Sequence, residues 1–223
     1  MAKNYGVFDI LGPVMIGPSS SHTAGAARLG RIAANIAGSD IKKVTFLLHG
    51  SFAKTYKGHG TDKALLAGVL GFEPHDERLR DSFIIASKEG LEYEFIESDL
   101  GDVHPNTVKF LFEKSNGTAF TVTGSSIGGG NVLIKEVNGE EVEFTGEYPT
   151  IITKHYDRPG VITAVTSLLS ELKVNIAFMK VIRKSKGQMA SMVVETDNPI
   201  PDEAIEGISK IKDIEKVFLV KPI

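Results

Sequence analysis

The segment "TIITKHYDRPGVITAVTSLLSELKVNIAF", residues 150–178, decides the fold that we predict for the C-terminal part of the chain. Its opening "TIITKH" is rich in β-branched residues and predicts a strand. The apolar residues after Pro159 recur at helical spacing and predict a helix, with Asp157 as its N-cap and Pro159 in its first turn. A second strand is expected to begin at Asn175.

Further stretches complete this pattern. "VNIAFMKVIR" and "QMASMVVET" predict two strands, "PDEAIEGISKI" predicts a helix, and "IEKVFLVKP" predicts a last strand. The order strand–helix–strand–strand–helix–strand is that of a ferredoxin-like βαββαβ unit. The pattern resets at "GEYP", so we expect one domain over residues 1–147 and a second over residues 148–223.

The N-terminal part mixes helices and strands. The sequence predicts a helix from about Ser21 to Gly38, a buried strand at Val44–Leu48, and a short helix in "TDKALLAGVLG". Further strands are expected in "SFIIAS", "YEFIE", "NTVKFLFE" and "AFTVTG". Asn138-Gly139, between alternating apolar residues, predicts a β-hairpin. We therefore assign the whole chain to the α/β (α+β) class.

Composition excludes several classes of function. The chain has 223 residues and a net charge of −3, which gives no basis for a nucleic-acid or membrane surface. Its first residues lack the features of a secretory signal, so we expect a cytoplasmic protein. It contains no cysteine, which excludes disulfides, a thiol nucleophile and an iron–sulfur cluster held by its own thiolates.

A hydroxyl-rich stretch, "IGPSSSHTAGAARLGR", precedes the first predicted helix. His22 lies among Ser19, Ser20, Ser21 and Thr23. Because a helix start has unpaired N–H groups and partial positive charge, these donors suit a carboxylate ligand. The alternative is that one serine caps the helix and the others are solvated. No feature assigns a base to a serine nucleophile, so the catalytic residues are unknown.

Two more stretches supply candidate ligand residues. In "HGSFAKTYKGHGTDKA", His59 lies between glycines, where backbone can approach a ligand closely, although a surface turn would have the same sequence. "VHPNT" adds Asn106, beside His104. The spacing of His49, His59 and His104 matches no zinc signature, so we predict no metal site.

A glycine-rich stretch, "GSSIGGGN" at residues 124–131, precedes the predicted hairpin. A dinucleotide-binding loop precedes a helix, so the stretch does not meet that pattern. We expect the glycines to serve close backbone packing rather than a ligand lid.

The second domain offers its own set of polar side chains. His155 and Asp157 lie where the first strand gives way to the helix, and Asn175 begins the second strand. Imidazole and amide groups can hold a carboxylate, and an aspartate can hold an ammonium, so together they suit a free amino acid. The alternative is that Asp157 only caps the helix.

"HYDRPGVITAV" followed by "VNIAF" resembles an ACT domain, the amino-acid-sensing module of metabolic enzymes. The resemblance is closest to the serine-binding ACT domain of phosphoglycerate dehydrogenases. It implies that His155, Asp157 and Asn175 bind the ligand. The chain departs from that pattern at Asp157, where the family has asparagine.

The N-terminal part resembles the β subunit of iron–sulfur-dependent L-serine dehydratases, through "FDILGPVMIGPSSSHTAG", "GSFAKTYKGHGTDKA", "HPNT" and "SIGGGN". It is also similar to the allosteric substrate-binding domain of some phosphoglycerate dehydrogenases. The resemblance implies a regulatory, carboxylate-binding role for residues 19–23, His59 and Asn106.

The resemblance also implies an activity and partners. The expected reaction converts L-serine to pyruvate and ammonia, as in gluconeogenesis from amino acids. A separate α subunit would hold the [4Fe–4S] cluster, and this chain would be inactive alone. L-Serine or a related amino acid is the expected ligand, and copies of the chain would associate through their ACT domains.

Two alternatives stay open. The chain could be a free-standing amino-acid sensor with no catalytic partner. It could also be a phosphate-handling enzyme that uses "SIGGGN" and the serine stretch, although it has no Gly-Lys-Ser/Thr motif.

Overall fold

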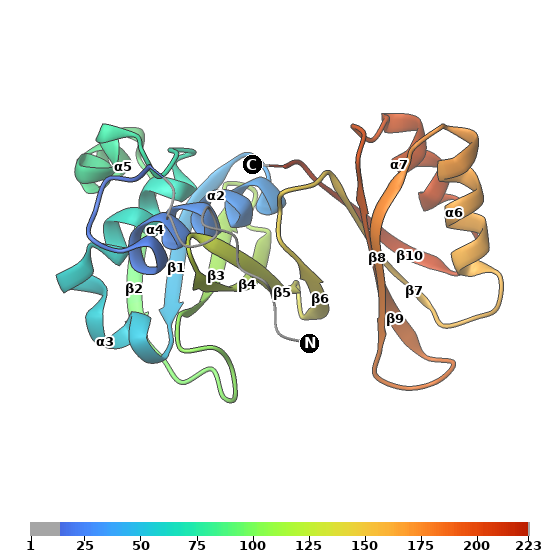
Figure 1. The fold of residues 1–223 in the computed structure, drawn as a ribbon, viewed down its shortest axis with the longest axis horizontal. Coiled ribbons are helices and arrows are strands. Elements are labelled where there is room, and N and C mark those ends of the chain that lie inside the picture. Colours follow the sequence, from blue (N-terminus) through green and yellow to red (C-terminus); the bar gives the residue numbers. More distant parts are fainter. Residues whose placement is uncertain (1–13, 223) are drawn as a thin grey trace. The chain divides into compact units, whose positions relative to one another are not determined.

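The computed structural model describes residues 14–222 (Figure 1), so the beginning of the "FDILGPVM" motif lies outside the described residues. The chain divides into two compact units, residues 1–134 and residues 135–223. We call these the first and second units. The predicted division of domains between residues 147 and 148 stays a prediction.

The first unit builds its sheet from strands that are far apart in sequence. The sheet, which continues into the second unit's residues, has the order β2-β1-β3-β4-β5-β6, with β1 parallel to β2 and antiparallel to β3. The strands are β1 (Ile41–Leu48), β2 (Glu92–Glu97), β3 (Thr107–Lys114), β4 (Ala119–Gly128), β5 (Asn131–Val137) and β6 (Glu140–Phe144). The helices are η1 (Ser20–Ala24, a π-helical turn), α2 (Gly25–Ala37), α3 (Gly50–His59), α4 (Thr61–Val69), η2 (Glu77–Asp81) and α5 (Ser82–Glu89).

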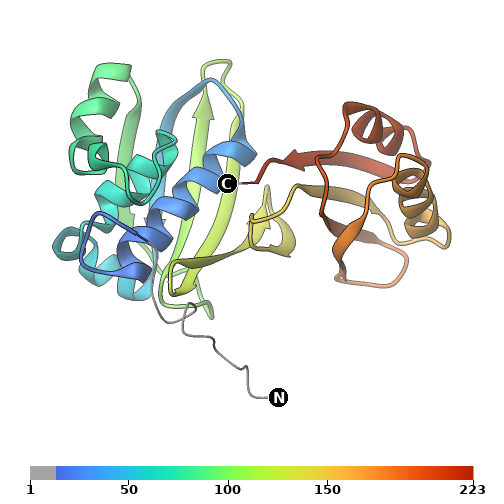
Figure 2. The ribbon, with the colours of Figure 1, turned by 45° about the horizontal axis from the view of Figure 1, so that its top comes forward.

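Helix α2 lies across one face of this sheet, as Figure 2 shows in blue. Its apolar side is buried, with Leu29 and Ile32 fully inaccessible, and it packs against α4 and β4. Gly38 ends α2 with a φ of 78°, as the sequence predicts. The core beneath it contains Phe46 and Phe110, whose ring centroids lie 5.5 Å apart.

The β5–β6 hairpin confirms the prediction made from Asn138-Gly139. Both residues have positive φ, 50° for Asn138 and 79° for Gly139, as a type I′ turn requires. The glycine-rich stretch before it forms the end of β4 and the following turn, where Gly128, Gly129 and Gly130 also have positive φ. These glycines therefore have a structural role.

One strand prediction for the first unit is wrong. "SFIIAS" forms α5 and not a strand, because a short apolar run has no periodicity that separates helix from strand. The sequence also predicted no helix after the strand that ends at Leu48, whereas residues Gly50–His59 form α3. Gly60, with φ of 66°, ends α3 and precedes α4, so the glycine marks a boundary between two helices.

The second unit confirms the ferredoxin-like prediction. Its elements are β7 (Thr150–Tyr156), α6 (Val161–Glu171), β8 (Ile176–Arg183), β9 (Met189–Thr196), α7 (Asp202–Ser209) and β10 (Ile214–Val220). The strands pair in the order β10-β7-β9-β8, and all three pairings are antiparallel. Helices α6 and α7 cover one face of the sheet (Figure 1), and Ile151, Val165 and Met192 are fully buried in the core between them.

The predicted start of α6 is wrong. The helix begins at Val161 with Gly160 as N-cap, so Pro159 precedes the first turn. Gly160 has φ of 94°, and no side chain caps the helix. Asp157 is not the cap because its carboxylate binds elsewhere, as described below.

Glu195 is a buried acid on β9. Its side chain is 8% exposed, and Oε1 is buried without a hydrogen-bond partner. Burial raises the pKa of Glu195 above its ordinary value of 4.5, an effect that a hydrogen bond with the Thr145 backbone opposes. The charged carboxylate is therefore a destabilising feature of the second unit.

Replacing Glu195 with glutamine should stabilise the second unit at pH 7. Because the folded-state pKa is raised, the wild type loses stability as the pH rises from about 4.5 through that pKa, and the neutral amide does not. Melting temperatures measured between pH 4 and pH 8 should coincide for the two proteins at the acidic end and separate toward neutral pH. Equal melting temperatures at pH 7 would contradict the prediction.

Candidate functional site

The serine stretch forms a helix start, as predicted. The Ser19 Oγ accepts a hydrogen bond from the His22 backbone N–H at 3.1 Å and so caps η1. Ser20 and Ser21 form the first turn of η1, and the Ser20 carbonyl accepts the N–H of Gly25. One serine therefore has the capping role that the alternative interpretation gave it.

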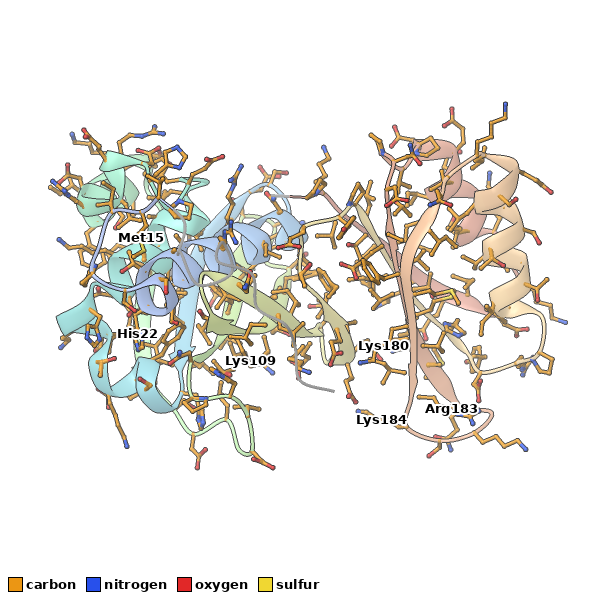
Figure 3. All side chains as sticks on the ribbon, in the orientation of Figure 1. Met15, His22, Lys109, Lys180, Arg183 and Lys184 are labelled. Atoms are coloured by element: carbon orange, nitrogen blue, oxygen red, sulfur yellow. The ribbon has the colours of Figure 1, made fainter. Side chains whose placement is uncertain are left out.

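His22 joins two separate parts of the first unit. Its Nε2 lies 3.1 Å from the Ser51 Oγ, and its Nδ1 lies 3.5 Å from the Ser19 Oγ. The ring packs at 5.3 Å from Phe52 and at 4.9 Å from His59, measured between centroids. Figure 3 labels His22 near the start of α2. We call Ser19, His22, Ser51 and His59 the histidine cluster.

The electrostatics of the histidine cluster favour a neutral imidazole at His22. Burial lowers the pKa of His22, and the nearby His59 lowers it further. A neutral imidazole has one N–H donor and one acceptor nitrogen, so it can bond to one hydroxyl as donor and to another as acceptor. The cluster is thus suited to orient hydroxyls toward a polar ligand.

Ser51 is a member of the cluster that the sequence prediction missed. It lies at the start of α3, where its N–H donates to the Pro105 carbonyl at 2.8 Å. Gly50 has φ of 57°, and a Cβ there would lie 2.7 Å from the Pro105 oxygen, so only glycine allows this approach. The signal was present in the sequence, because Ser51 follows β1 within the "HGSF" stretch.

Asn106 belongs to the same loop as Pro105. Its N–H donates to the His104 Nδ1 at 3.1 Å, and its carbonyl accepts from the Ser126 N–H at 3.0 Å. The preceding residue, Pro105, accepts the Ser51 N–H, so Asn106 lies next to the start of α3. The structure therefore brings the predicted residues His22 and His59 together and places the Asn106 loop against the adjoining helix.

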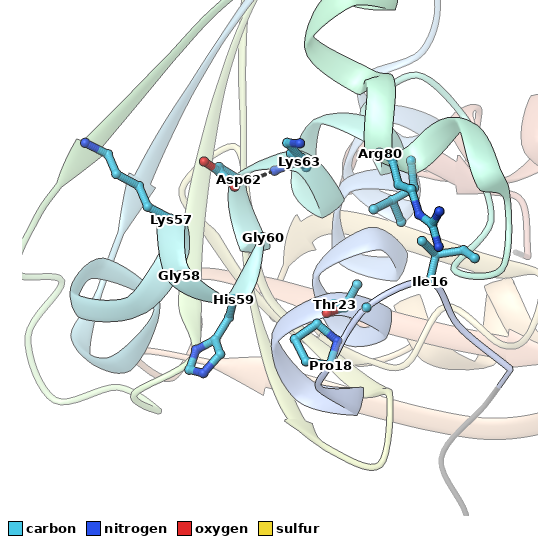
Figure 4. Close-up of a pocket in the computed structure, with 12 residues that line it drawn as sticks. Ile16, Pro18, Thr23, Lys57, Gly58, His59, Gly60, Asp62, Lys63 and Arg80 are labelled. Atoms are coloured by element: carbon cyan, nitrogen blue, oxygen red, sulfur yellow. Dashed lines mark hydrogen bonds between the residues drawn. The ribbon is translucent and has the colours of Figure 1, made fainter.

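Thr23 has a different environment from its neighbours. It is 1% exposed, and its Oγ1 is buried with no hydrogen-bond partner. It lines a cavity of about 390 Å³ beside the histidine cluster (Figure 4). The cavity is lined by Ile16, Gly17, Pro18, Thr23, Lys57, Gly58, His59, Gly60, Asp62, Lys63, Leu79 and Arg80.

The sequence prediction missed the basic residues of this cavity. Lys57 and Lys63 flank His59 and were within a stretch already singled out, but Arg80 lies in η2, outside every motif. Burial raises the pKa of Asp62, the one acid in the lining, although the Lys63 N–H bond to its carboxyl opposes the shift.

In the second unit, His155 is a buried residue one position before the end of β7. It is 2% exposed, and its Nδ1 lies 3.2 Å from the Thr153 Oγ1. Burial lowers the pKa of His155, and Asp157 partly offsets this. The imidazole is therefore fixed in orientation by its neighbour.

Asp157 fastens the loop before α6 to the β8–β9 hairpin. Its carboxylate accepts hydrogen bonds from the Arg183 guanidinium at 2.7 Å and from the Gly187 N–H at 3.1 Å. These two donors lower the pKa of Asp157, the Gly187 bond most strongly. An ammonium ligand would have to compete with Arg183 for this carboxylate.

One copy of the chain does not bring Asn175 to His155. His155 pairs with Ala190, which pairs with Arg183 at the far end of β8, whereas Asn175 precedes β8. At about 3.3 Å per residue, this separates Asn175 from the His155 end of the sheet by roughly 25 Å. The Asn175 amide instead binds Asp197.

Within residues 14–222, no cluster of three or more histidine, cysteine, aspartate or glutamate side chains is placed to hold a metal ion. The chain also has no cysteine. Its residues therefore do not fit an iron–sulfur cluster, which needs thiolate ligands. In the same described part, no helix has the length and apolar character to cross a lipid bilayer.

Comparisons with known proteins agree with this architecture. The family model "Serine dehydratase beta chain" matches residues 6–88, and the ACT domain model matches residues 150–213. The "Probable L-serine dehydratase, beta chain" of Bacillus subtilis is 45% identical over 215 residues, which are 96% of this chain and 97% of that protein. The chain belongs to the L-serine dehydratase beta-chain family.

Two further relatives of this beta-chain family member also match most of this chain. The L-serine dehydratase beta chain of Peptoniphilus asaccharolyticus is 44% identical over 211 residues, 93% of this chain and 95% of that one. A D-3-phosphoglycerate dehydrogenase of Methanocaldococcus jannaschii is 32% identical over 197 residues, 87% of this chain and 37% of the dehydrogenase. The predicted family, the ACT domain and the similarity to phosphoglycerate dehydrogenases are confirmed.

Proposed function

We propose that this chain is the β subunit of an L-serine dehydratase, which converts L-serine to pyruvate and ammonia together with an α subunit. The observation that carries the proposal is the similarity to beta chains over almost the whole length, including the serine stretch and the ACT domain. The histidine cluster supports it, because its hydroxyls and imidazole suit a carboxylate-bearing ligand.

We propose that the α subunit holds the [4Fe–4S] cluster with its own cysteines. When bound there, such a cluster would supply a Lewis-acidic iron site for the serine hydroxyl. The residues of this chain would bind and orient the carboxylate of an amino acid, with Ser19, His22 and Ser51 as donors and acceptors. The chain alone would then be inactive.

Residues of the first unit form the proposed ligand site. Its members are Ser19, Ser20, Ser21, His22, Thr23, His59 and Asn106, to which the geometry adds Ser51. Their catalytic roles stay unassigned. We further propose a cytoplasmic location and a domain division between residues 147 and 148.

The ACT domain is proposed to bind L-serine or a related amino acid through His155, Asp157 and Asn175. Since His155 and Asn175 lie at opposite ends of the second unit's sheet, a shared site needs two copies of the chain. β8 is an edge strand with Phe178 58% exposed and Met179 44% exposed, which favours association of copies through this domain.

Shared ACT sites predict a complementation result. His155→Gln and Asn175→Ala proteins should each bind L-serine at least about tenfold more weakly, because each loses hydrogen bonds to the ligand. Mixing the two variants should restore one of the two sites in each mixed dimer, because that site takes His155 from the Asn175→Ala copy and Asn175 from the His155→Gln copy. Isothermal titration of the separate and mixed variants checks this, and a mixture no better than its components would contradict a site shared between copies.

The function is tested by co-expressing the chain with a cysteine-bearing α chain under anaerobic conditions. The pair should release pyruvate from L-serine, and each chain alone should not. A free-standing sensor would instead bind an amino acid and give no pyruvate with any partner. Activity of this chain alone, after reconstitution with iron and sulfide, would contradict the division of roles.

A further inference from the structure

The cavity beside the histidine cluster contains polar groups that lack partners. Arg80, which is exposed on η2, has no carboxylate partner among the described residues. The nearby Arg78, by contrast, pairs with Asp76 at 2.5 Å. The Thr23 Oγ1 is buried and unpartnered, although a buried hydroxyl is normally hydrogen-bonded. The Arg80 guanidinium and the Thr23 hydroxyl are thus two donors in the lining of one cavity, and neither has an acceptor among the described residues.

The start of helix α4 also lies at the cavity. The helix has nine residues and its N-cap Gly60 has no side chain, but the Asp62 carboxylate accepts hydrogen bonds from the backbone N–H groups of Lys63 and of Asp62 itself. Gly60, Asp62 and Lys63 all line the cavity, so the positive end of α4 lies beside it. In Figure 4 the Thr23 oxygen lies on the side of that residue that faces Gly60 and His59.

From these features we infer that the cavity binds a small dianion without an ammonium group, held by Arg80, Lys63 and the Thr23 hydroxyl. The inference rests on the proposed ligand-binding role of the first unit and names a second kind of ligand for it. The shared chemistry is that of a phosphate or a dicarboxylate.

The charges of the lining favour a dianion over a zwitterionic amino acid. An ammonium would lie among Arg80, Lys63 and His59, with Asp62 as its single carboxylate partner. The Asp62 carboxyl already accepts the Lys63 N–H at 2.8 Å, so part of its capacity to bind an ammonium is used. Lys57 is not counted, because its Nζ lies 5.5 Å from the Tyr56 ring and points away from the cavity in Figure 4.

Titration calorimetry of the full chain with inorganic phosphate, malonate and L-serine at constant ionic strength tests the inference. Phosphate or malonate should bind with one site per chain and more tightly than L-serine does at this cavity. The two dianions distinguish a phosphate ligand from a dicarboxylate ligand. Arg80→Gln should weaken the dianion that binds by about tenfold or more, because a charge-assisted bond is lost.

Matched variants separate a built site from general attraction of anions. Arg78→Gln removes the same charge two residues away, outside the cavity lining, and should leave the affinity unchanged. Thr23→Val keeps the shape of the buried side chain and should weaken binding by about threefold to tenfold. If Thr23→Val does not fold, the Arg80→Gln and Arg78→Gln comparison still decides the question.

The inference is overturned if neither dianion binds, if Arg78→Gln weakens binding as much as Arg80→Gln does, or if the cavity variants affect L-serine alone. This outcome is independent of the pyruvate assay. A co-expressed pair that deaminates serine while its β chain binds no dianion would leave the proposed function standing. A chain that binds a dianion but gives no pyruvate with its partner would contradict the proposed function and leave dianion binding at the cavity standing.

Discussion

Replacing Gly68 with alanine should destabilise the first unit by about 3 kcal/mol or more. Helices α2 and α4 cross with their backbones in contact, because a Cβ at Gly68 would lie 2.0 Å from the Ala27 carbonyl oxygen and 2.8 Å from the Arg31 nitrogen. Backbone atoms cannot rotate away as a flexible side chain can. Overpacking in a core typically costs about 1–3 kcal/mol of unfolding free energy. We expect the loss in Gly68→Ala to lie at or above the upper end of this range.

Gly30 makes the same contact from the other helix. A Cβ there would lie 2.2 Å from the Leu65 carbonyl oxygen. The Gly30→Ala protein should therefore resemble Gly68→Ala, and the double variant should fail to fold, because a small domain has about 5–15 kcal/mol of stability in total. Urea unfolding followed by circular dichroism measures each change.

Gly58 supplies the matched control for these alanine variants. It lies within α3, and a Cβ there meets nothing within 4 Å. Gly58→Ala should therefore stabilise the chain by about 0.5–1 kcal/mol, since alanine favours a helix interior over glycine. If Gly68→Ala and Gly58→Ala changed the unfolding free energy equally, the prediction that α2 and α4 leave no room for a side chain at Gly68 would be contradicted.

Replacing His22 with glutamine should raise the serine concentration for half-maximal pyruvate release by the dehydratase complex, by roughly tenfold to a hundredfold. His22 lies between the Ser19 and Ser51 hydroxyls, and a glutamine side chain cannot reproduce both of these positions. Loss of hydrogen bonds of this kind costs about 1.5–3 kcal/mol when the partner is a charged carboxylate. The serine concentration that gives half-maximal pyruvate release measures the shift.

His75 provides a histidine control outside the cluster. Its side chain is 59% exposed and lies 3.5 Å from Glu73. His75→Gln should leave both the serine dependence and the melting temperature unchanged. A His22→Gln complex with normal serine dependence would show that the histidine cluster serves only to cap η1 and pack α3.

The second unit was predictable because its signals are local. The strands and helices of residues 150–220 each follow from periodicity and β-branching within a few residues, and together they specify the ferredoxin-like order. The hairpin at Asn138-Gly139 follows from the low cost of positive φ at these two residue types. The start of α6 was missed because Asp157 has a partner, Arg183, that only the paired strands bring near.

In the first unit, short segments were ambiguous. α3 and α5 contain glycines or brief apolar runs that suit several conformations. Packing of α3 against β2 and β3, and of α5 against α4, selects the helix. Tertiary contacts also place Phe83 against Tyr93, with ring centroids 5.4 Å apart. Propensity is a weak guide where packing supplies most of the stability.

The sequence by itself determined the family, the secondary structure of the C-terminal part and the candidate residues His22 and His59. Only the tertiary structure decided that Ser51 bonds to His22, that Arg80 lies beside Thr23, and that Asn175 and His155 are apart. The physical reason is that short-range propensity fixes the shape of a segment. Contacts between distant residues depend instead on strand register and on how closely helices can cross.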